Sequence, residues 1–397
     1  MKTILFVNFP VSGHINPQYE ICKELASENH VIYLTAERYK QKYEDIPNLT
    51  VAAYPAEFME FYDELLKQSV LSEKFMALLY VFYSLTDKVI DFAMEYIGQL
   101  KPDLIVCDAL ALWGKMAARY YNIPCALFFA SFMGDTNFLR KSPTFLFGMM
   151  KSICLDFGYI QKFSKIKKNM EKKYGDVVDG MSNMMSHQGL FSIVHTSEQF
   201  HPYGDQYPDN VHFLRPSMFS ETKIVGKRDT IFIGIGTIAS SDNFWDVCLD
   251  ATRKLNYRVV ISFGNNPHNK VNKAKLRQNV EIYDNLSLER YREELMRSEI
   301  FINHGGFNGV MDGIIAETKM LIYPKTVETK NNGKIIEDFG CGKVYPKGEF
   351  LAEKLEKEIE ELLNMDCKEN LWKLKESFIN SETCFDVAAS LRKEYHI

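Results

Sequence analysis

The chain has 397 residues, of which 46% are hydrophobic and 25% charged, and its formal net charge is −5. One hydrophobic core stops growing at about 250–300 residues, so this length favours two domains. The negative charge argues against nucleic acid or an anionic membrane surface as a partner. No uninterrupted apolar run reaches the roughly 18 residues of a membrane-spanning helix, so we expect no stable membrane insertion.

The eight cysteines form no CxxC pair and show no spacing typical of a metal site. Several lie in apolar runs such as LIVCD and IPCALFF, where a cysteine is usually a small buried hydrophobe. The first apolar run, residues 3–9, is too short for a signal peptide and is followed at once by Pro10. We therefore expect reduced thiols and a cytoplasmic protein.

Strands and helices alternate along the first half of the chain. Residues 3–9 (TILFVNF) predict a buried strand, which a loop containing SGHIN follows. A helix is expected from Pro17 to about Ser27, because Asn16 can cap a helix and proline suits its first turn. Further strands are predicted in HVIYLT, PDLIVCD and IPCALFF. This alternation predicts a parallel sheet with helices on both faces.

Two segments of the first half, residues 55–95 and 132–170, are rich in Phe, Tyr and Met. Helical inserts of this composition could form the wall of an apolar pocket. A plain helical core explains the pattern equally well, because Met and Phe at helical spacing are more often core residues.

The second half repeats the alternation after a polar, aperiodic break at residues 215–229. We place a linker at 216–228, between an N-terminal domain (1–215) and a C-terminal domain (229–375). A C-terminal helix over 376–397 is expected to pack back on the first domain. The predicted fold class is α/β, with two facing Rossmann-like, doubly wound domains and a cleft between them. In such sheets ligands bind at the carboxyl ends of the strands.

Two polar side chains follow strands of the first predicted sheet. His14 lies just past the first strand, and histidine is the side chain best suited to general base catalysis near neutral pH. Asp108 ends the strand PDLIVCD and could fix the imidazole tautomer by accepting a hydrogen bond. The alternative for Asp108 is an N-cap of the helix that follows it. A loop histidine alone is often merely solvated or structural.

The stretch INHGGFNGVMDG, residues 302–313, places glycines between an apolar strand and an amphipathic helix. Free N–H groups at a helix start favour an anion, and glycine lets the backbone approach it closely. We predict a phosphate site in which His304 donates to an oxygen while Gly306, Asn308 and Gly309 offer N–H groups. The alternative is a glycine-rich turn capped by the histidine.

A second glycine motif, GIGTIA at residues 234–239, fits the loose dinucleotide pattern GxGxxG/A after a strand. A dinucleotide site would need an acidic residue at the end of the next strand. That strand, YRVVISFG, ends without one. A dehydrogenase is therefore a weak interpretation of this motif.

Taken together, these motifs resemble the family 1 glycosyltransferases, which use UDP-sugars and have two Rossmann-like domains in the GT-B fold. The segment FVNFPVSGHINPQYEICKEL resembles the family's Gly-His-x-x-Pro segment, here Gly13 to Pro17. The stretch from FINHGGFNGVMDGI to VETKNNGKIIEDFGCG resembles its donor-binding signature. The subgroup is similar to bacterial macrolide- and flavonoid-type enzymes, and the resemblance covers nearly the whole length.

The resemblance implies roles for individual positions. It implies that His14 is the catalytic base, that Asp108 orients it, and that His304 contacts the diphosphate. The remaining donor-binding positions that it implies are Gly13, Thr237, Gly306, Asn308, Gly309, Asp312 at the ribose, and Glu328 with Thr329 at the sugar. It implies no cofactor besides a UDP-sugar as co-substrate, with a dTDP-sugar as the alternative. No metal is needed if His304 and the helix-start N–H groups neutralise the leaving diphosphate.

The chain departs from the family pattern at three places. Thr329 replaces the glutamine of the sugar-binding Asp/Glu-Gln pair, and a hydroxyl cannot reproduce an amide's paired contacts. The segment YDNLSLERY lacks the family's Pro-Gln and its base-stacking aromatic residue. Arg215 stands where relatives often have glycine.

These residues predict an inverting transferase that moves a sugar, glucose by resemblance, to a hydroxyl of a small, partly apolar acceptor. Three alternatives stay open: a related transferase acting on a membrane lipid, a sugar-nucleotide epimerase or hydrolase, and a catalytically silent sugar-nucleotide-binding protein.

Overall fold

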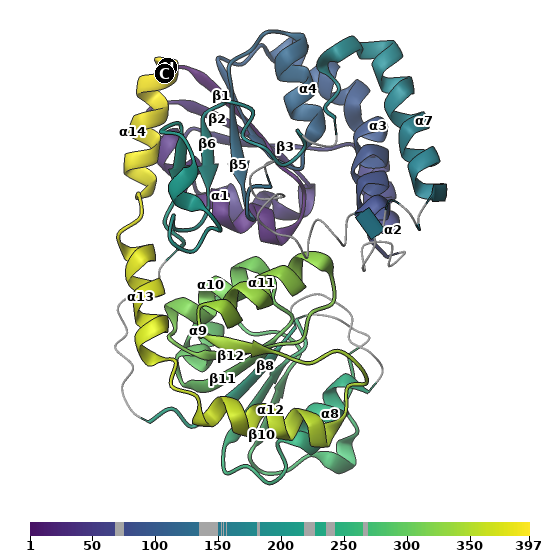
Figure 1. Ribbon diagram of the computed structural model, residues 1–397. Helices are drawn as coiled ribbons and strands as arrows, with labels where there is room; N and C mark the ends of the chain where they lie inside the picture. The colour runs from purple at the N-terminus through teal and green to yellow at the C-terminus, as the bar shows by residue number, and fades with distance from the viewer. Residues whose placement is uncertain are drawn as a thin grey trace. The chain divides into compact units, whose positions relative to one another are not determined.

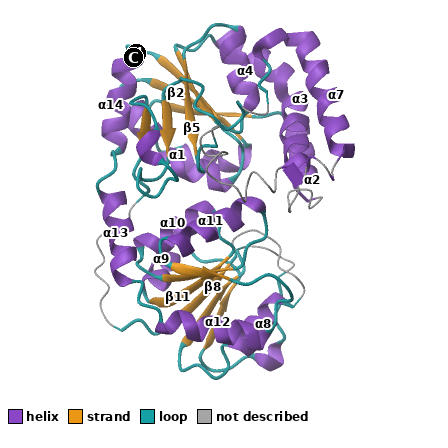
Figure 2. Cartoon of the chain, in the orientation of Figure 1, coloured by secondary structure: helices purple, strands orange, loops and turns teal. Residues whose placement is uncertain are grey.

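The computed structural model describes residues 1–397 except 68–74, 135–149, 152, 154, 156, 181–182, 218–226, 236–242 and 265–268. The chain divides into two compact units. Unit 1 contains Met1–Ser217 together with Ser377–Ile397, and unit 2 contains Met218–Glu376. Each unit is an α/β domain with its own parallel sheet (Figures 1 and 2).

Unit 1 contains a seven-stranded parallel sheet with the order β3-β2-β1-β4-β5-β6-β7. Its strands are β1 (Thr3–Val7), β2 (His30–Thr35), β3 (Leu49–Ala53), β4 (Leu104–Asp108), β5 (Cys125–Phe129), β6 (Ser192–Val194) and β7 (Val211–Phe213). Its helices are α1 (Ser12–Ala26), α2 (Ala56–Lys67), α3 (Phe75–Leu100), α4 (Leu112–Tyr120), α7 (Phe157–Tyr174) and α14 (Cys384–Tyr395), with 3₁₀ turns η1 (Glu37–Tyr43), η2 (Gly175–Val177) and η3 (Gly204–Gln206).

The continuous apolar run of β1 follows from burial of both faces of the sheet. Leu5 and Val7 belong to one core cluster, which contains Trp113 of α4. Ile4 and Phe6 belong to the other, which includes side chains of α1 and α14. Because successive side chains of a strand point to opposite faces, only a strand buried on both faces reads as an unbroken apolar run.

The aromatic inserts of unit 1 supply core residues. Phe58 and Tyr62 of α2 and Phe82 of α3 are all buried in the cluster around Trp113. For these described side chains the helical-core alternative is therefore correct. Residues 135–149 of the second insert lie outside the described part of the chain.

The C-terminal segment is not the single helix expected over residues 376–397. It consists of α13 (Lys368–Ile379) and α14, and Thr383 starts the second helix through a capping box with Asp386. Helix α14 packs on α1, where the Arg392 guanidinium donates to the Glu24 carbonyl over 3.0 Å. The break forms a bridge to the end of β7, in which the Arg215 N–H donates to the Glu382 carbonyl over 2.8 Å. The backbone N–H of Arg215 thus links the C-terminal segment to the strand end of unit 1.

Unit 2 contains a six-stranded parallel sheet with the order β10-β9-β8-β11-β12-β13. Its strands are β8 (Thr230–Gly234), β9 (Arg258–Ser262), β10 (Val280–Tyr283), β11 (Ser298–Asn303), β12 (Lys319–Ile322) and β13 (Gly342–Val344). Its helices are α8 (Phe244–Ala251), α9 (Leu288–Met296), α10 (Phe307–Ile315), α11 (Val327–Asp338) and α12 (Ala352–Asn364), with the 3₁₀ turn η4 (Lys273–Lys275) and most of α13.

Both sheets therefore reverse their strand order beside their first strand. In unit 1 the reversal lies between β1 and β4, and in unit 2 between β8 and β11. Loops leave such a point in opposite directions and open a crevice at the carboxyl ends of the strands, where ligands bind in open α/β sheets. Within the described ranges, no helix is both long and apolar enough to cross a lipid bilayer.

Candidate functional site

His14 lies in the first turn of α1 rather than in a preceding loop, which corrects the predicted start of this helix. Helix α1 begins at Ser12, and the N–H groups of His14 and Ile15 both donate to the Val11 carbonyl, over 2.9 and 3.1 Å. Pro17 consequently lies inside the helix. The early start places Gly13 and His14 directly beside the end of β1.

His14 and Asp108 meet at the reversal point of the first sheet. Nδ1 of His14 lies 2.8 Å from Oδ2 of Asp108, and the carboxylate is fully buried. The other carboxylate oxygen accepts from the Leu110 N–H over 2.9 Å. Helix α4 starts only at Leu112, with Ala111 as its N-cap, so Asp108 is not the cap of that helix. Asp108 instead holds the proton on Nδ1 of His14, which leaves Nε2 as the basic nitrogen.

Two further residues extend this network, and sequence reasoning missed both. Gln18 Nε2 donates to the same Asp108 oxygen over 3.3 Å, and its Oε1 accepts from the Tyr33 hydroxyl over 3.0 Å. Both Gln18 and Tyr33 are buried. The spacing in the sequence could have predicted Gln18, because it follows His14 by four residues and positions i and i+4 share one helix face.

An aromatic cluster lies beside the imidazole. The Phe9 ring centroid is 5.7 Å from that of His14, and Phe9 in turn contacts the rings of Tyr62, Phe82 and Trp113. The hydroxyl of Tyr62 is buried, and no described residue forms a hydrogen bond with it. The imidazole thus has a carboxylate on one side and an apolar environment on the other.

At the reversal point of the second sheet, the loop after β11 is held in a tight turn. Gly305 has a φ of +82°, and an added Cβ would lie 2.7 Å from both Ile322 and the Thr329 carbonyl oxygen. The Asn303 side chain accepts from the Gly305 N–H over 2.7 Å, and Asn332 donates to the Gly305 carbonyl over 2.9 Å. Glycine is required here by both conformation and space.

His304 packs against the next glycine. A Cβ at Gly306 would lie 2.5 Å from His304 Nε2, so only glycine admits the ring in this position. Burial lowers the pKa of His304 to about 4, so the imidazole is neutral at pH 7. Its Nδ1 is buried and has no hydrogen-bond partner among the described residues. A neutral imidazole can still donate one N–H to a ligand.

Helix α10 begins beside this histidine, with Gly306 as its N-cap. Its first intrahelical bond to the cap runs from the Val310 N–H to the Gly306 carbonyl, so Asn308 and Gly309 occupy the first turn, as predicted. Among the described residues, a Cβ at Gly309 would meet only Phe301, at 4.0 Å. The described part of the chain therefore leaves room over this glycine.

Asp312 lies further along α10, where its carboxylate accepts from the Tyr291 hydroxyl over 3.1 Å. Burial raises the pKa of Asp312 to about 6, and the hydrogen bond from Tyr291 opposes this rise. Asp312 is thus on the helix that begins at the glycine turn, and it titrates close to neutral pH.

The structure gives Thr329 a different role from the predicted sugar contact. Thr329 is buried, and its hydroxyl oxygen accepts from the N–H groups of Lys325 and Thr326, over 3.0 and 2.9 Å. With Thr326 it forms the capping box that starts α11. The hydroxyl of Thr329 therefore uses its hydrogen-bonding capacity on the backbone of its own chain segment. Glu328, one residue earlier, is exposed in the first turn of the helix, and Thr237 lies outside the described residues.

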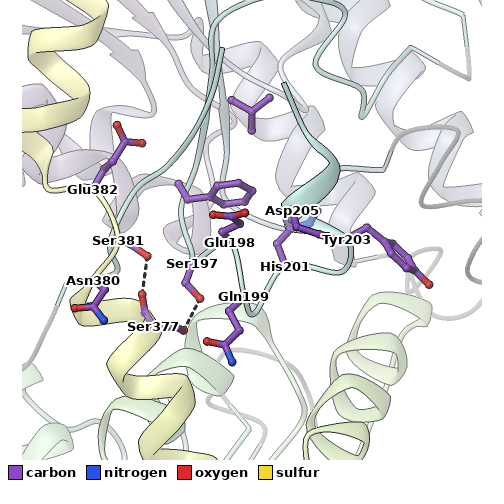
Figure 3. A pocket seen from close by; sticks show the side chains of 13 residues that line it. Ser197, Glu198, Gln199, His201, Tyr203, Asp205, Ser377, Asn380, Ser381 and Glu382 are labelled. Carbon is purple, nitrogen blue, oxygen red and sulfur yellow. Dashed lines mark hydrogen bonds between the residues drawn. The ribbon is translucent and has the colours of Figure 1, made fainter. Parts of the chain in front are cut away.

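A separate cavity of about 740 Å³ lies in unit 1, and none of the predicted site residues lines it. It lies where residues 197–205 and β7 meet the α13–α14 junction, and Glu198, Asp205 and Glu382 make it acidic (Figure 3). Ser197 and Ser377 are hydrogen-bonded across it at 2.7 Å. Among the residues that the structure describes, no three His, Cys, Asp or Glu side chains gather as a metal site requires.

Known proteins resemble both the sequence and the fold. Residues 239–384 match the model of the glycosyltransferase family 28 C-terminal domain. Two Bacillus subtilis (strain 168) proteins named as uncharacterized UDP-glucosyltransferases are each 24% identical: YojK over 92% of this chain and 90% of its own, and YdhE over 98% and 96%. The calicheamicin glycosyltransferase CalG4 superposes with a TM-score of 0.76 at 17% identity, covering 100% of this chain and 98% of CalG4.

The chain has the GT-B fold, and its matches support a glycosyltransferase enzyme. This confirms the fold class that the sequence motifs predicted, and the similar proteins agree with the predicted glycosyltransferase activity. The glycosyltransferase therefore has two Rossmann-like units, and each has polar groups at the point where its sheet reverses.

Proposed function

We propose that the protein is an inverting glycosyltransferase that moves glucose from UDP-glucose to a hydroxyl of a small, partly apolar acceptor. The observation that carries this proposal is the 2.8 Å contact between His14 Nδ1 and the buried Asp108 carboxylate. An imidazole oriented in this way can act as a general base near neutral pH.

In the proposed reaction, the acceptor hydroxyl gives its proton to His14 Nε2 while its oxygen attacks the anomeric carbon. The attack comes from the face opposite the nucleotide, so the bond from that carbon to the diphosphate oxygen breaks and the configuration inverts. Asp108 stabilises the imidazolium that forms. Gln18, through its bond to Asp108, keeps the carboxylate in position.

On the donor side, we propose that the diphosphate binds at the start of α10. The first-turn N–H groups and the helix dipole favour an anion there, and His304 adds a neutral N–H donor. These groups would stabilise the charge of the leaving diphosphate. By resemblance, Asp312 binds the ribose and Glu328 the sugar. We propose no metal ion and no cofactor besides the co-substrate.

The names of relatives support the donor and leave one alternative. YojK and YdhE are named UDP-glucosyltransferases. The Streptomyces sp. SF2575 glycosyltransferase SsfS6, which superposes with a TM-score of 0.65, has been solved with thymidine diphosphate. A dTDP-sugar is therefore the second donor to test. The Phe9 ring beside His14 supports a partly apolar acceptor.

The test is product analysis with UDP-glucose and dTDP-glucose, with and without a panel of soluble phenols and macrolides. We expect an acceptor to gain one hexose, and we expect an α-linked donor to give a β-linked product by NMR. An epimerised or hydrolysed donor in the absence of acceptor would replace this proposal with an epimerase or hydrolase. Donor binding without any turnover would indicate a silent sugar-nucleotide-binding protein.

A further inference from the structure

Lys325 lies at the same edge of the second sheet as the glycine turn. It follows β12, which pairs with β11 so that Asn303 lies opposite Ile322. The next residue, Tyr323, donates its N–H to the Asn303 carbonyl over 2.7 Å. Lys325 is thus only two residues beyond a backbone contact to the residue that precedes His304.

The backbone at Lys325 is fixed by Thr329. The N–H groups of Lys325 and Thr326 both donate to the Thr329 hydroxyl oxygen. The residue that replaces the family's sugar-binding glutamine is therefore the one that holds Lys325 in place. The threonine thus removes the glutamine amide from this edge of the sheet, and its hydroxyl instead fixes the backbone that carries the Lys325 ammonium.

The side chain of Lys325 is held over aromatic rings. Its ammonium lies 4.1 Å from the ring centroid of Tyr323 and 6.0 Å from that of Phe244. Those two rings and Phe350 pack on one another, with centroids 4.3–5.3 Å apart. Cation–π attraction keeps a half-buried ammonium in place without neutralising its charge.

Within the described part of unit 2, Lys325 differs from comparable lysines, which are paired with carboxylates. Lys319 pairs with Glu299 at 3.0 Å, and Lys375 pairs with Glu317 at 2.6 Å. Lys325 has no carboxylate within 4.0 Å among the described residues, and burial lowers its pKa. The starts of α8 and α11, at Phe244 and Val327, add positive partial charge nearby. An anion bound from outside the protein would stabilise a half-buried cation in these surroundings.

We propose that Lys325 binds an anionic group of the nucleotide-sugar donor, either the diphosphate or a carboxylate on the transferred sugar. This inference rests on the proposed function. It makes Lys325 a donor-recognition residue that takes the place of the missing glutamine contact.

The experiment compares Lys325→Met, Lys325→Arg and the wild type by calorimetric titration. The ligands are the nucleoside monophosphate, the diphosphate, the diphospho-glucose and the diphospho-glucuronate of the preferred base. Methionine fills the space over the aromatic rings without charge, so the fold should be kept, which a thermal melt verifies. Lys330→Met is the matched control, because Lys330 is an exposed lysine of α11.

We expect Lys325→Met to weaken binding about 10- to 100-fold, as loss of a charge-assisted hydrogen bond does, while Lys325→Arg keeps most of the affinity. Weaker binding of every diphosphate, with the monophosphate unchanged, assigns the contact to the diphosphate. Weaker binding of the glucuronate alone assigns it to the sugar carboxylate.

Unchanged affinity of Lys325→Met for all four ligands would overturn the inference, as would an equal loss in Lys330→Met. A wild-type protein that binds none of these nucleotides would instead contradict the proposed function itself.

Discussion

The two sheets share one strand order around their reversal points, yet the sites at these points are built from different groups. In unit 1 the site consists of side chains: an imidazole, a buried carboxylate and an amide linked by hydrogen bonds. In unit 2 it consists mainly of backbone: glycines, a helix start and a neutral histidine. The shared topology indicates where a ligand can bind, and the residues placed there suit the proposed base in unit 1 and the proposed anion site in unit 2.

The largest effect should come from disturbing the side-chain site. Asp108→Asn keeps the shape of the residue but turns an amide N–H toward His14 Nδ1, which favours the wrong imidazole tautomer. We expect kcat to fall by about 10²–10⁴-fold with little change in the thermal midpoint.

Asp103→Asn is the matched control for this variant, because Asp103 precedes the same strand at its other end and bonds Lys2 and the Thr3 N–H. Steady-state rates are measured for both variants, and only Asp108→Asn should be slow. Equal rates for Asp108→Asn and the wild type would remove the carboxylate from the mechanism.

The site at the start of α10 consists mainly of backbone groups, so its nucleotide affinity should be sensitive to added side-chain volume rather than to a change of charge. Gly309→Ala adds a methyl group that meets only Phe301 among the described residues, so the free energy of unfolding should stay constant or rise by up to about 1 kcal/mol. Nucleotide affinity should nevertheless fall about tenfold, because the methyl group keeps the phosphate from a first-turn N–H. Tight binding by a stable Gly309→Ala protein would place the anion elsewhere.

The two sites should also differ in their pH dependence. If Asp312 binds the ribose, as we propose, its ionised carboxylate accepts hydrogen bonds from the ribose hydroxyls more strongly than the neutral acid does. Its raised pKa of about 6 means that this charge is lost as the pH falls from 7 to 5. From the ionised fractions we expect UDP-glucose to bind about tenfold more weakly at pH 5 than at pH 7. UDP-glucose is the suitable ligand because its diphosphate does not titrate in this range.

Binding by Asp312→Asn should be weaker and independent of pH over the same interval. A pH dependence that persists in this variant would assign the titration to another group.

The smallest effect concerns the support of the carboxylate. Gln18→Leu removes one hydrogen bond to Asp108 and the acceptor of the buried Tyr33 hydroxyl. Transfer should slow by up to about tenfold, and the free energy of unfolding should fall by about 1–3 kcal/mol because a buried hydroxyl loses its partner. Adding Tyr33→Phe should restore part of the stability but none of the rate. Restoration of both would show that Gln18 acts only through folding.

The sequence predicted the parallel sheets and the pairing of His14 with Asp108, because apolar runs that end in a polar residue mark the carboxyl ends of buried strands. It misplaced the start of α1, because Val11 provides no side-chain cap and Pro17 suggested a later first turn. It missed the capping role of Thr329, since a Thr-x-x-Thr pair lacks the Glu or Gln of the usual capping box. These errors concern local hydrogen bonds that several residue types can make.

The most direct test of the central claim is the transfer rate of His14→Ala measured together with its affinity for the nucleotide-sugar. If His14 is the base, transfer falls by about 10²–10⁴-fold while the dissociation constant of the donor stays within a factor of about two. Transfer at the wild-type rate by a His14→Ala protein that still binds the donor would contradict the account.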